Sequence, residues 1–261
     1  MYQLDSSAFD AVLDQVGDTP FTAAPYFYLQ RRACDVYVDS PAKPHCLVIV
    51  PHTPSPGVYV LGVGSLDSEG LERLADFLTG LDTAGGFLVP VELVPPIRTR
   101  CHIDLEVEGL CFTYPQIPRG FKVTRPEFAR RLEGADASLL GALPGDVTFL
   151  WQSHGNPASL LAEGLDFGVI RKGRLVSMAS SLVLTPRYCD VGVYTLPRYR
   201  NLGYATDCVE ALFAQTLVEG VRPLWRIGVR QKVATKLAEK LFMEEIGTNG
   251  RELYLQTCQR P

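Results

Sequence analysis

The chain has 261 residues, of which 46% are hydrophobic and 21% are charged. This composition is typical of a folded globular protein and excludes a disordered chain. The length allows two domains of roughly 100 to 150 residues each. The formal net charge of −4 gives no basic surface field, so we expect no binding to nucleic acid or to a membrane surface.

The sequence also indicates a compartment. No apolar run approaches the roughly 20 residues that span a bilayer, and the start of the chain, Met1 to Ser7, does not resemble a signal peptide. The seven cysteines, at positions 34, 46, 101, 111, 189, 208 and 258, include no Cys-x-x-Cys pair of the kind found in zinc fingers. We therefore expect a cytoplasmic protein with buried, reduced thiols and no metal site.

The N-terminal part of the chain alternates short apolar runs with breaks rich in Pro, Ser and Gly, a pattern that predicts strands separated by turns. The expected elements are a helix at 7–16, strands at 34–38, 46–50 and 58–63, a helix from Asp67 or Ser68 to Gly80, an extended segment at 87–94 and a strand pair within 98–113. Asp104, Glu106 and Glu108 would share one strand face, which we interpret as a solvated surface rather than a metal or cation site.

A Pro- and Gly-containing segment, 115–120, marks the expected boundary between an N-terminal domain, 1–117, and a C-terminal domain, 118–261. Just beyond it, Thr124 and Glu127 fit a capping box that would start a helix. The other elements expected in this half are a strand at 121–123, helices at 135–143, 156–164 and 231–242, a hairpin of 165–170 with 174–184, and strands at 189–195, 224–229 and 252–256.

The most informative stretch is a strand, a loop and a helix in the C-terminal half. Val191, Val193 and Thr195 alternate as in a strand, and Pro197 ends it because proline has no N–H to donate to a sheet. After a loop that contains Gly203, apolar residues recur at helical spacing. The stripe consists of Ala205, Cys208, Val209, Leu212, Phe213, Thr216 and Leu217. This geometry directs free N–H groups and the positive end of a helix dipole at one point, where a phosphate or pyrophosphate can bind.

The loop sequence resembles a known motif. Residues 200–205, Arg-Asn-Leu-Gly-Tyr-Ala, fit the Arg/Gln-x-x-Gly-x-Gly/Ala pyrophosphate loop of the GNAT superfamily of acyl-CoA-dependent N-acyltransferases. The wider run 194–206 resembles the branch that includes zwittermicin-resistance-type acetyltransferases. The expected order over residues 120–256, strand, helix, helix, three strands, helix, strand, helix, strand, agrees with the GNAT fold.

The resemblance implies an α+β fold class with a mixed sheet, the GNAT fold occupying the C-terminal domain. The N-terminal α/β domain resembles a degenerate copy of the same half-fold. Its segment 62–70 has glycines before a helix but not the spacing of the pyrophosphate loop. We expect this domain to shape the structure or the substrate site rather than to form a second active site.

The resemblance also implies a function, the transfer of an acetyl or other short acyl group from a CoA thioester to a primary amine of a small molecule. The reaction would be direct, in a ternary complex of enzyme, acyl-CoA and amine, and a homodimer is left open. The backbone of Val193, Tyr194 and Thr195 would hold the pantetheine arm and the thioester. The residues assigned to the pyrophosphate are Asn201, Leu202, Gly203, Tyr204 and Ala205, with Thr206 in the adjoining helical turn. Arg200 would pair with a phosphate, and Arg198 fits either a second phosphate or a solvated loop.

The catalytic assignments are Asp190 as general base and Tyr194 as acid toward the leaving thiolate. A solvent-facing strand residue and a packed aromatic residue are the respective structural alternatives. Many relatives have Gly-Lys where this chain has Asn201-Leu202, and many use a tyrosine as general acid where it has Ala238. The second hypothesis is therefore a catalytically weak acyl-CoA-binding or interaction module.

Overall fold

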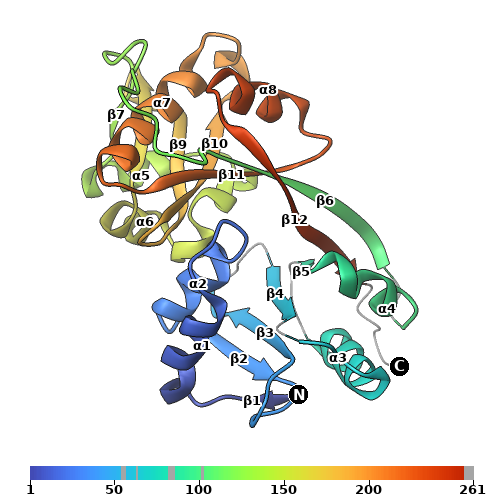
Figure 1. Cartoon of the computed structure of the whole chain (residues 1–261). Helices are drawn as coiled ribbons and strands as arrows, with labels where there is room; N and C mark the ends of the chain where they lie inside the picture. The colour runs from blue at the N-terminus through green and yellow to red at the C-terminus, as the bar shows by residue number, and fades with distance from the viewer. Residues whose placement is uncertain (54–56, 63, 82–85, 101–102, 256–261) are drawn as a thin grey trace.

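The structure is a computed structural model that describes residues 1–53, 57–62, 64–81, 86–100 and 103–255. The strands of this described part form one mixed sheet in the order β1-β2-β3-β4-β5-β12-β6-β11-β10-β9-β8-β7. Each strand from β1 to β6 can be exchanged with the strand numbered six higher, β1 with β7, β2 with β8 and so on. The exchange gives the same strand order, read from the opposite edge of the sheet. The sheet therefore has an internal two-fold repeat that relates the two halves of the chain (Figure 1).

Each half supplies the same succession of strands and α-helices. The N-terminal half contains β1 (Tyr2–Gln3), α1 (Phe9–Val16), α2 (Ala23–Gln30), β2 (Cys34–Val38), β3 (Cys46–Pro51), β4 (Gly57–Gly62), α3 (Ser68–Gly80), β5 (Gly86–Val89), α4 (Val94–Arg98) and β6 (Ile103–Thr113). The C-terminal half contains β7 (Arg130–Arg131), α5 (Ala137–Gly141), α6 (Pro157–Glu163), β8 (Asp166–Arg171), β9 (Arg174–Leu184), β10 (Tyr188–Thr195), α7 (Tyr204–Val218), β11 (Arg222–Gly228), α8 (Lys232–Lys240) and β12 (Glu244–Leu255).

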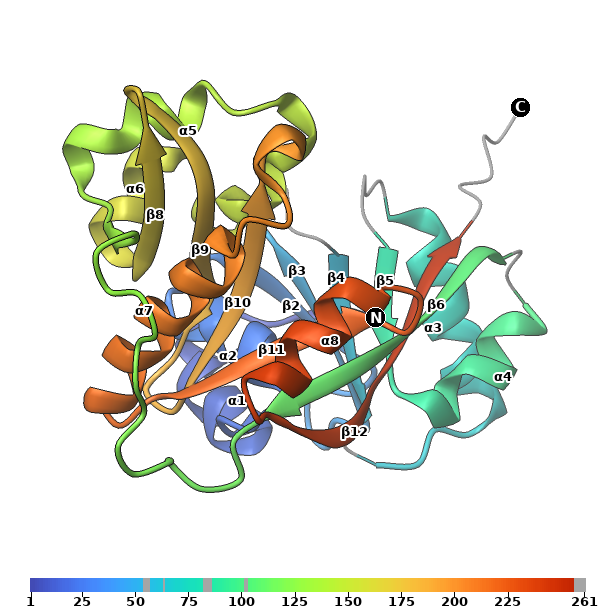
Figure 2. The same cartoon turned by 90° about the horizontal axis from the view of Figure 1, so that it is seen from above.

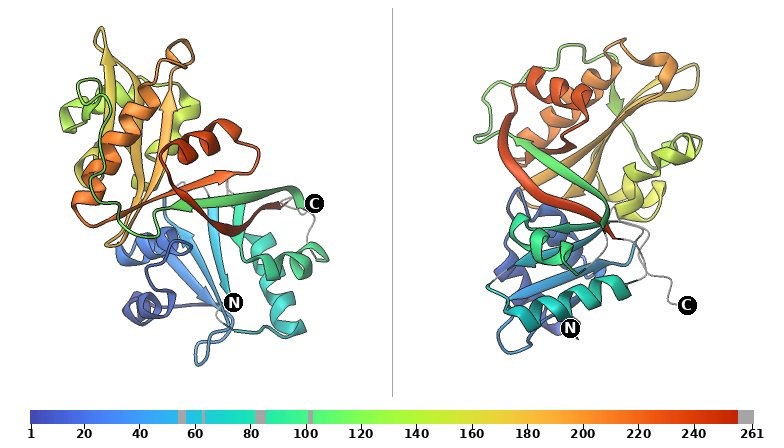
Figure 3. Two further views of the ribbon diagram at one scale, coloured as in Figure 1. Left: turned by 45° about the horizontal axis from the view of Figure 1, so that its top comes forward. Right: turned by 90° about the vertical axis from the view of Figure 1, so that its right-hand side faces the viewer.

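The two halves exchange their last strands. β6, the last strand of the N-terminal half, pairs antiparallel with β11 on one side and with β12 on the other. β12, the last strand of the chain, pairs with β5 of the N-terminal half. Figures 1 and 3 show β6 and β12 running together between the two lobes of the molecule. The predicted boundary at 117/118 lies between β6 and β7, and the sheet crosses it without a break.

The helices form one layer on each face of the sheet (Figure 2). On β10, Cys189, Val191 and Val193 pack into the cluster that contains the apolar side of α7. On the opposite face, Tyr188 packs with α1 and α2, and Tyr194 packs with the cluster formed by α5 and α6. This alternation is the period of two expected of a strand covered on both faces.

Many expected elements are confirmed, including the strands at β2, β3 and β4 and the β8–β9 hairpin. Asp67 caps α3 by accepting from the Gly70 N–H at 2.7 Å. Asn156 caps α6 by accepting from the Ser159 N–H at 2.9 Å. The five cysteines in the described part, 34, 46, 111, 189 and 208, are buried and free. The side chains of 103–108, and with them the expected acidic strand face, lie outside the described residues.

Four expectations are wrong. Residues 121–123, expected to form a strand, have no regular secondary structure. The extended segment ends at Val89, because Pro90 leads into a short 3₁₀ helix, η2 (Val91–Leu93), and then α4. The expected strand pair within 98–113 is the single strand β6, whose partners come from the C-terminal half. The expected capping-box helix at Thr124 does not form, because the Thr124 N–H and hydroxyl bond to the distant carboxylate of Glu210 instead, at 2.6 and 2.9 Å.

Helix α2 is an element that the periodicity misses. Six of its eight residues are buried, so it has no polar face to reveal the helical period. It packs on β9 and β10 of the C-terminal half as well as on its own half. A helix that packs against both halves is covered on most of its sides, so most of its surface must be apolar.

The strand exchange predicts that the C-terminal half does not fold alone. Residues 118–261 lack β6, so β11 and β12 lose the strand between them. We expect the fragment to be insoluble or to lack cooperative thermal unfolding, and we expect coexpression with residues 1–117 to restore a soluble complex. Circular dichroism melts of both preparations are the measurement. A fragment 118–261 that unfolds cooperatively by itself would contradict this prediction.

Candidate active site

The two parallel strand pairs mark two points where the sheet opens. β10 and β11 pair only over Tyr188–Asp190 with Arg222–Leu224. Beyond this register β10 continues on β9 to Thr195, while β11 continues on β6. The two strands therefore diverge, and the edge of β10 from Val191 onward turns toward the space between them. The predicted pantetheine residues Val193, Tyr194 and Thr195 lie on this edge, half-buried.

The loop after β10 leads into α7 with an open helix N-terminus. Asn201 and Gly203 have φ angles of 62° and 85°, in the left-handed region, where glycine is tolerated best and asparagine better than most residues. Gly203 is the N-cap of α7, and it has no side chain to cap the first N–H groups. The N–H groups at the start of this 15-residue helix are therefore available to an anion.

The N-terminal half shows the opposite arrangement at the same position. α3 follows β4 as α7 follows β10, but the Asp67 carboxylate occupies its N-terminus. A carboxylate at this place satisfies a helix N–H and repels a second anion. The strand, loop and open helix N-terminus expected from the sequence are therefore present in the C-terminal half, whereas the N-terminus of α3 is filled by its own cap.

The predicted phosphate arginines differ in their contacts. The Arg200 Nε donates to the Thr195 carbonyl oxygen at 3.2 Å, so this side chain turns back over the end of β10. Arg198 lies on the short 3₁₀ helix Pro197–Tyr199 and is exposed. The Thr195 hydroxyl lies 2.7 Å from the Ser177 hydroxyl, which fixes the end of the strand.

Two further arginines lie beside the loop and have no sequence signal. The Arg125 guanidinium bonds to both oxygens of Asp207 in the first turns of α7, at 2.9 and 2.7 Å, and to the Leu202 carbonyl at 3.1 Å. Arg171, at the end of β8, lies over the Tyr204 ring at 5.2 Å and donates to its hydroxyl at 3.3 Å. Both residues come from segments remote in sequence, and only the fold brings them to the loop.

Asp190, the predicted general base, is held in an ion pair. The residue is 3% exposed, and its carboxylate accepts from the Arg226 guanidinium, with the Nε at 2.8 Å. Burial opposes the charge of Arg226, but the Asp190 carboxylate and the phenol of Tyr59 together raise the pKa of the guanidinium above its ordinary value. Asp190 is therefore engaged by Arg226 on β11 and does not face solvent, and its role as general base stays a prediction.

Tyr194 lies on the same face of β10 as Asp190, two residues past Gly192. A Cβ at Gly192 would lie 2.7 Å from Leu182 and 2.9 Å from Leu150, so these side chains cover the strand closely. Tyr194 packs against the same cluster, which also contains Trp151. The predicted catalytic residues Asp190 and Tyr194 therefore share the face opposite α7, on either side of a tightly covered glycine.

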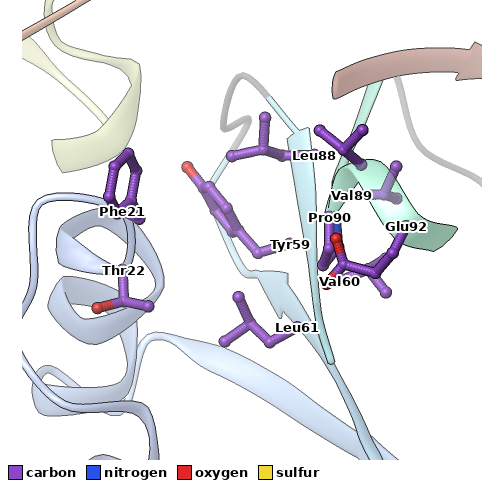
Figure 4. Close-up of a pocket in the computed structure, with 10 residues that line it drawn as sticks. Phe21, Thr22, Tyr59, Val60, Leu61, Leu88, Val89, Pro90 and Glu92 are labelled. Carbon is purple, nitrogen blue, oxygen red and sulfur yellow. The ribbon is translucent and has the colours of Figure 1, made fainter. Parts of the chain in front are cut away.

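The second parallel pair, β4 with β5, opens onto a cavity of about 240 Å³. Figure 4 shows the phenol of Tyr59 pointing toward the ring of Phe21, with Leu61 and Leu88 beside it. Glu92 supplies a carboxylate among the remaining lining residues, Thr22, Val60, Val89, Pro90 and Val91. This cavity is the N-terminal counterpart of the opening between β10 and β11, without a phosphate-binding helix beside it.

Comparison with known proteins agrees with this geometry. Residues 146–246 match the family model of the GNAT acetyltransferase. The chain is 36% identical over 101 residues to an uncharacterized N-acetyltransferase from the mutA 5' region of Streptomyces virginiae, an alignment that covers 38% of this chain and 40% of that protein. The chain thus spans less than half the length of this relative.

Two solved structures resemble nearly the whole chain. A GCN5-related N-acetyltransferase-like protein from Streptococcus suis has a TM-score of 0.71 at 19% identity and covers 96% of this chain and 99% of its own. A tandem GNAT protein from the clavulanic acid biosynthesis pathway has a TM-score of 0.61 at 12% identity, with 97% of both chains covered. The chain therefore matches the GNAT acetyltransferase family over residues 146–246. Its complete fold is of the tandem GNAT type, which confirms the expected fold class and the resemblance of the N-terminal half.

A buried carboxyl group near the site predicts a pH effect. Asp166, at the start of β8, is 1% exposed, and neither of its oxygens has a hydrogen-bond partner within the described part of the chain. Burial raises the pKa of Asp166 to about 7, although Ser180, Ser181 and Arg131 oppose the shift. The folded protein therefore retains a proton here that the unfolded chain loses above a pH of about 4.

We expect the free energy of unfolding to fall as pH rises from about 4 to about 7, since the folded state binds the extra proton in this range. Asp166→Asn should remove this slope and stabilise the protein at pH 8 by a few kcal/mol, at about 1.4 kcal/mol per pKa unit. Urea unfolding at several pH values measures the difference. Asp136→Asn is the control, because Arg130 lowers the pKa of Asp136 and its effect should stay constant over this range. A parallel pH dependence in wild type and Asp166→Asn would refute the prediction.

Proposed function

We propose that this protein is an acetyl-CoA-dependent N-acetyltransferase that acetylates a primary amine of a small molecule. The observation that supports it most strongly is the joint occurrence of two features. The edge of β10 is free where it leaves β11, and the α7 N-terminus beside it is uncapped. An extended amide-containing arm that ends in a pyrophosphate needs both features at this spacing.

The binding roles follow from the positions of the residues. The backbone of Val193, Tyr194 and Thr195 would bond to the pantetheine arm and place the thioester between β10 and β11. The pyrophosphate would bind to the backbone between Asn201 and Thr206. The residues proposed for this pyrophosphate-binding segment are Asn201, Leu202, Gly203, Tyr204, Ala205 and Thr206. Arg200 and Arg198 add positive charge at the same edge.

The reaction requires no covalent enzyme intermediate. The amine nitrogen attacks the thioester carbonyl carbon, the carbon–sulfur bond breaks, and the products are an amide and the CoA thiol. The nitrogen loses one proton and the departing sulfur gains one. We propose that the Tyr194 hydroxyl donates the proton that the departing sulfur gains. Because Asp190 is paired with Arg226, we propose that the amine proton leaves through water, with Asp190 as the alternative acceptor.

A catalytically weak acyl-CoA-binding or interaction module is the second candidate. The ion pair of Asp190 with Arg226 favours it, since it engages the carboxylate that was expected to act as the base. For the N-terminal half, 1–117, we propose a role in building the acceptor side of the site. Within the described residues no helix is long and apolar enough to cross a bilayer.

The first prediction from this function is binding. Calorimetry should show that the protein binds acetyl-CoA at micromolar concentrations, because the α7 N-terminus offers a preformed pyrophosphate site. Asp67→Gly, which opens the N-terminus of α3, is a control that should not change the affinity in the C-terminal half. Absence of binding at high micromolar acetyl-CoA would exclude both candidate functions.

The second prediction separates catalysis from binding. With CoA release measured across a panel of primary amines, Tyr194→Phe should lower kcat by about 10²-fold and leave acetyl-CoA affinity unchanged. Asp190→Asn should destabilise the fold by about 3 kcal/mol, because it removes the carboxylate charge that balances the guanidinium of Arg226, and Asp190→Asn with Arg226→Met should restore stability. Activity in this double variant would show that Asp190 is not the base. Unchanged kcat in Tyr194→Phe would show that Tyr194 is only a packed aromatic.

A further inference from the structure

The segment before β7 is a strap across α7. We use this name for residues 121–131, which join the two halves of the sheet. Phe121 anchors one end by packing on Phe213 of α7, with ring centroids 6.2 Å apart. The other end becomes β7, which pairs with β8. Between these anchors the strap makes its polar contacts with α7.

Two buried carboxylates of α7 are held by consecutive strap residues. Glu210, 6% exposed, accepts from the N–H and the hydroxyl of Thr124. Asp207, 1% exposed, accepts two bonds from Arg125. Burial raises the pKa of Asp207, and the contact with Arg125 opposes this shift. The strap therefore supplies the partners that allow two acids to remain beneath the open end of α7.

Arg125 also holds the loop itself. Its Nη2 donates to the Leu202 carbonyl, and a Cβ placed on Gly203 would lie 2.3 Å from this nitrogen. The guanidinium is thus in direct contact with the turn that presents the N–H groups. It lies 4.6 Å from the Phe128 ring of the strap, which limits its movement.

Charge at this point determines what α7 can bind. A pyrophosphate brings two negative charges to a helix whose first turns contain Asp207. Without Arg125 the carboxylate would repel the ligand across a few ångströms of protein, where screening by salt is weak. With Arg125 bonded to both carboxylate oxygens the pair is neutral, and the free N–H groups and the helix dipole dominate.

We propose that Arg125 is a positioning residue for acetyl-CoA, which neutralises Asp207 and fixes the Leu202–Gly203 turn so that α7 can accept the pyrophosphate. The inference rests on the proposed function, because it concerns the same acetyl-CoA site. It adds that affinity depends on a residue that need not touch the ligand.

The test is a double-mutant cycle on acetyl-CoA affinity, measured by calorimetry on the full chain. Arg125→Gln should weaken binding by about tenfold or more, since it exposes the ligand to the Asp207 charge. Asp207→Asn alone should bind as well as wild type or better. The double variant Arg125→Gln with Asp207→Asn should regain most of the lost affinity, because it removes the repelling charge.

The cycle distinguishes charge from loss of structure. If Arg125 acts only as a structural support, the double variant binds no better than Arg125→Gln, and the neutralisation is refuted. Arg130→Gln is the matched control, because Arg130 lies on the same strap and bonds to both oxygens of Asp136 away from α7. It should alter thermal stability without altering acetyl-CoA affinity.

The same experiment distinguishes a loss of folding from a loss of acetyl-CoA binding. Arg125→Lys retains the positive charge and should bind acetyl-CoA more tightly than Arg125→Gln. If Arg125→Gln unfolds, Arg125→Lys serves as the folded variant. Wild-type protein that does not bind acetyl-CoA would overturn the proposed function and this inference together. Wild-type binding with equal affinity in Arg125→Gln would overturn the inference alone.

Discussion

The pairing of β6 with β11 is the contact on which the rest of the structure depends. A strand that leaves its neighbour exposes backbone groups on both sides of the gap, at a cost for every buried group left unpaired. Because β6 satisfies the far edge of β11, that strand can separate from β10 after Leu224 and remain part of the sheet. The opening that we assign to the pantetheine arm thus depends on a strand from the other half of the chain.

The internal repeat shows how a small chemical difference divides the two halves. Both place a helix after the strand that diverges, and both pair that strand in parallel over three residues. At α3 the first residue before the helix is Asp67, and its carboxylate fills the N-terminus. At α7 the same position is Gly203, in the left-handed conformation and without a cap. One architecture therefore yields one helix with an open N-terminus and one whose N-terminus is filled by its own cap.

Sequence alone could predict the features that depend on local pattern. The β10 strand, the loop with Gly203 and the stripe of α7 are local, and the structure confirms them. The contacts that the sequence could not show join distant residues. Thr124 carries a capping pattern, yet Glu210 satisfies its N–H and hydroxyl from 86 residues away. In a single strand Asp190 would be solvent-facing or catalytic, but the fold buries it and pairs it with Arg226 on β11.

The two faces of the sheet around β10 are covered by different halves of the chain. A substitution in one half therefore affects mainly one face. On one face, α7 and the strap that holds its carboxylates both come from the C-terminal half, so one half builds the side that we propose for acetyl-CoA. On the other face, α2 of the N-terminal half packs on β9 and β10, and Tyr59 of β4 influences Arg226 beside Asp190. Changes in the N-terminal half therefore reach the face that carries Asp190 and Tyr194 while leaving the pyrophosphate loop intact. Under the proposed function, this arrangement would let the preference for the acceptor amine change without loss of the acetyl-CoA site.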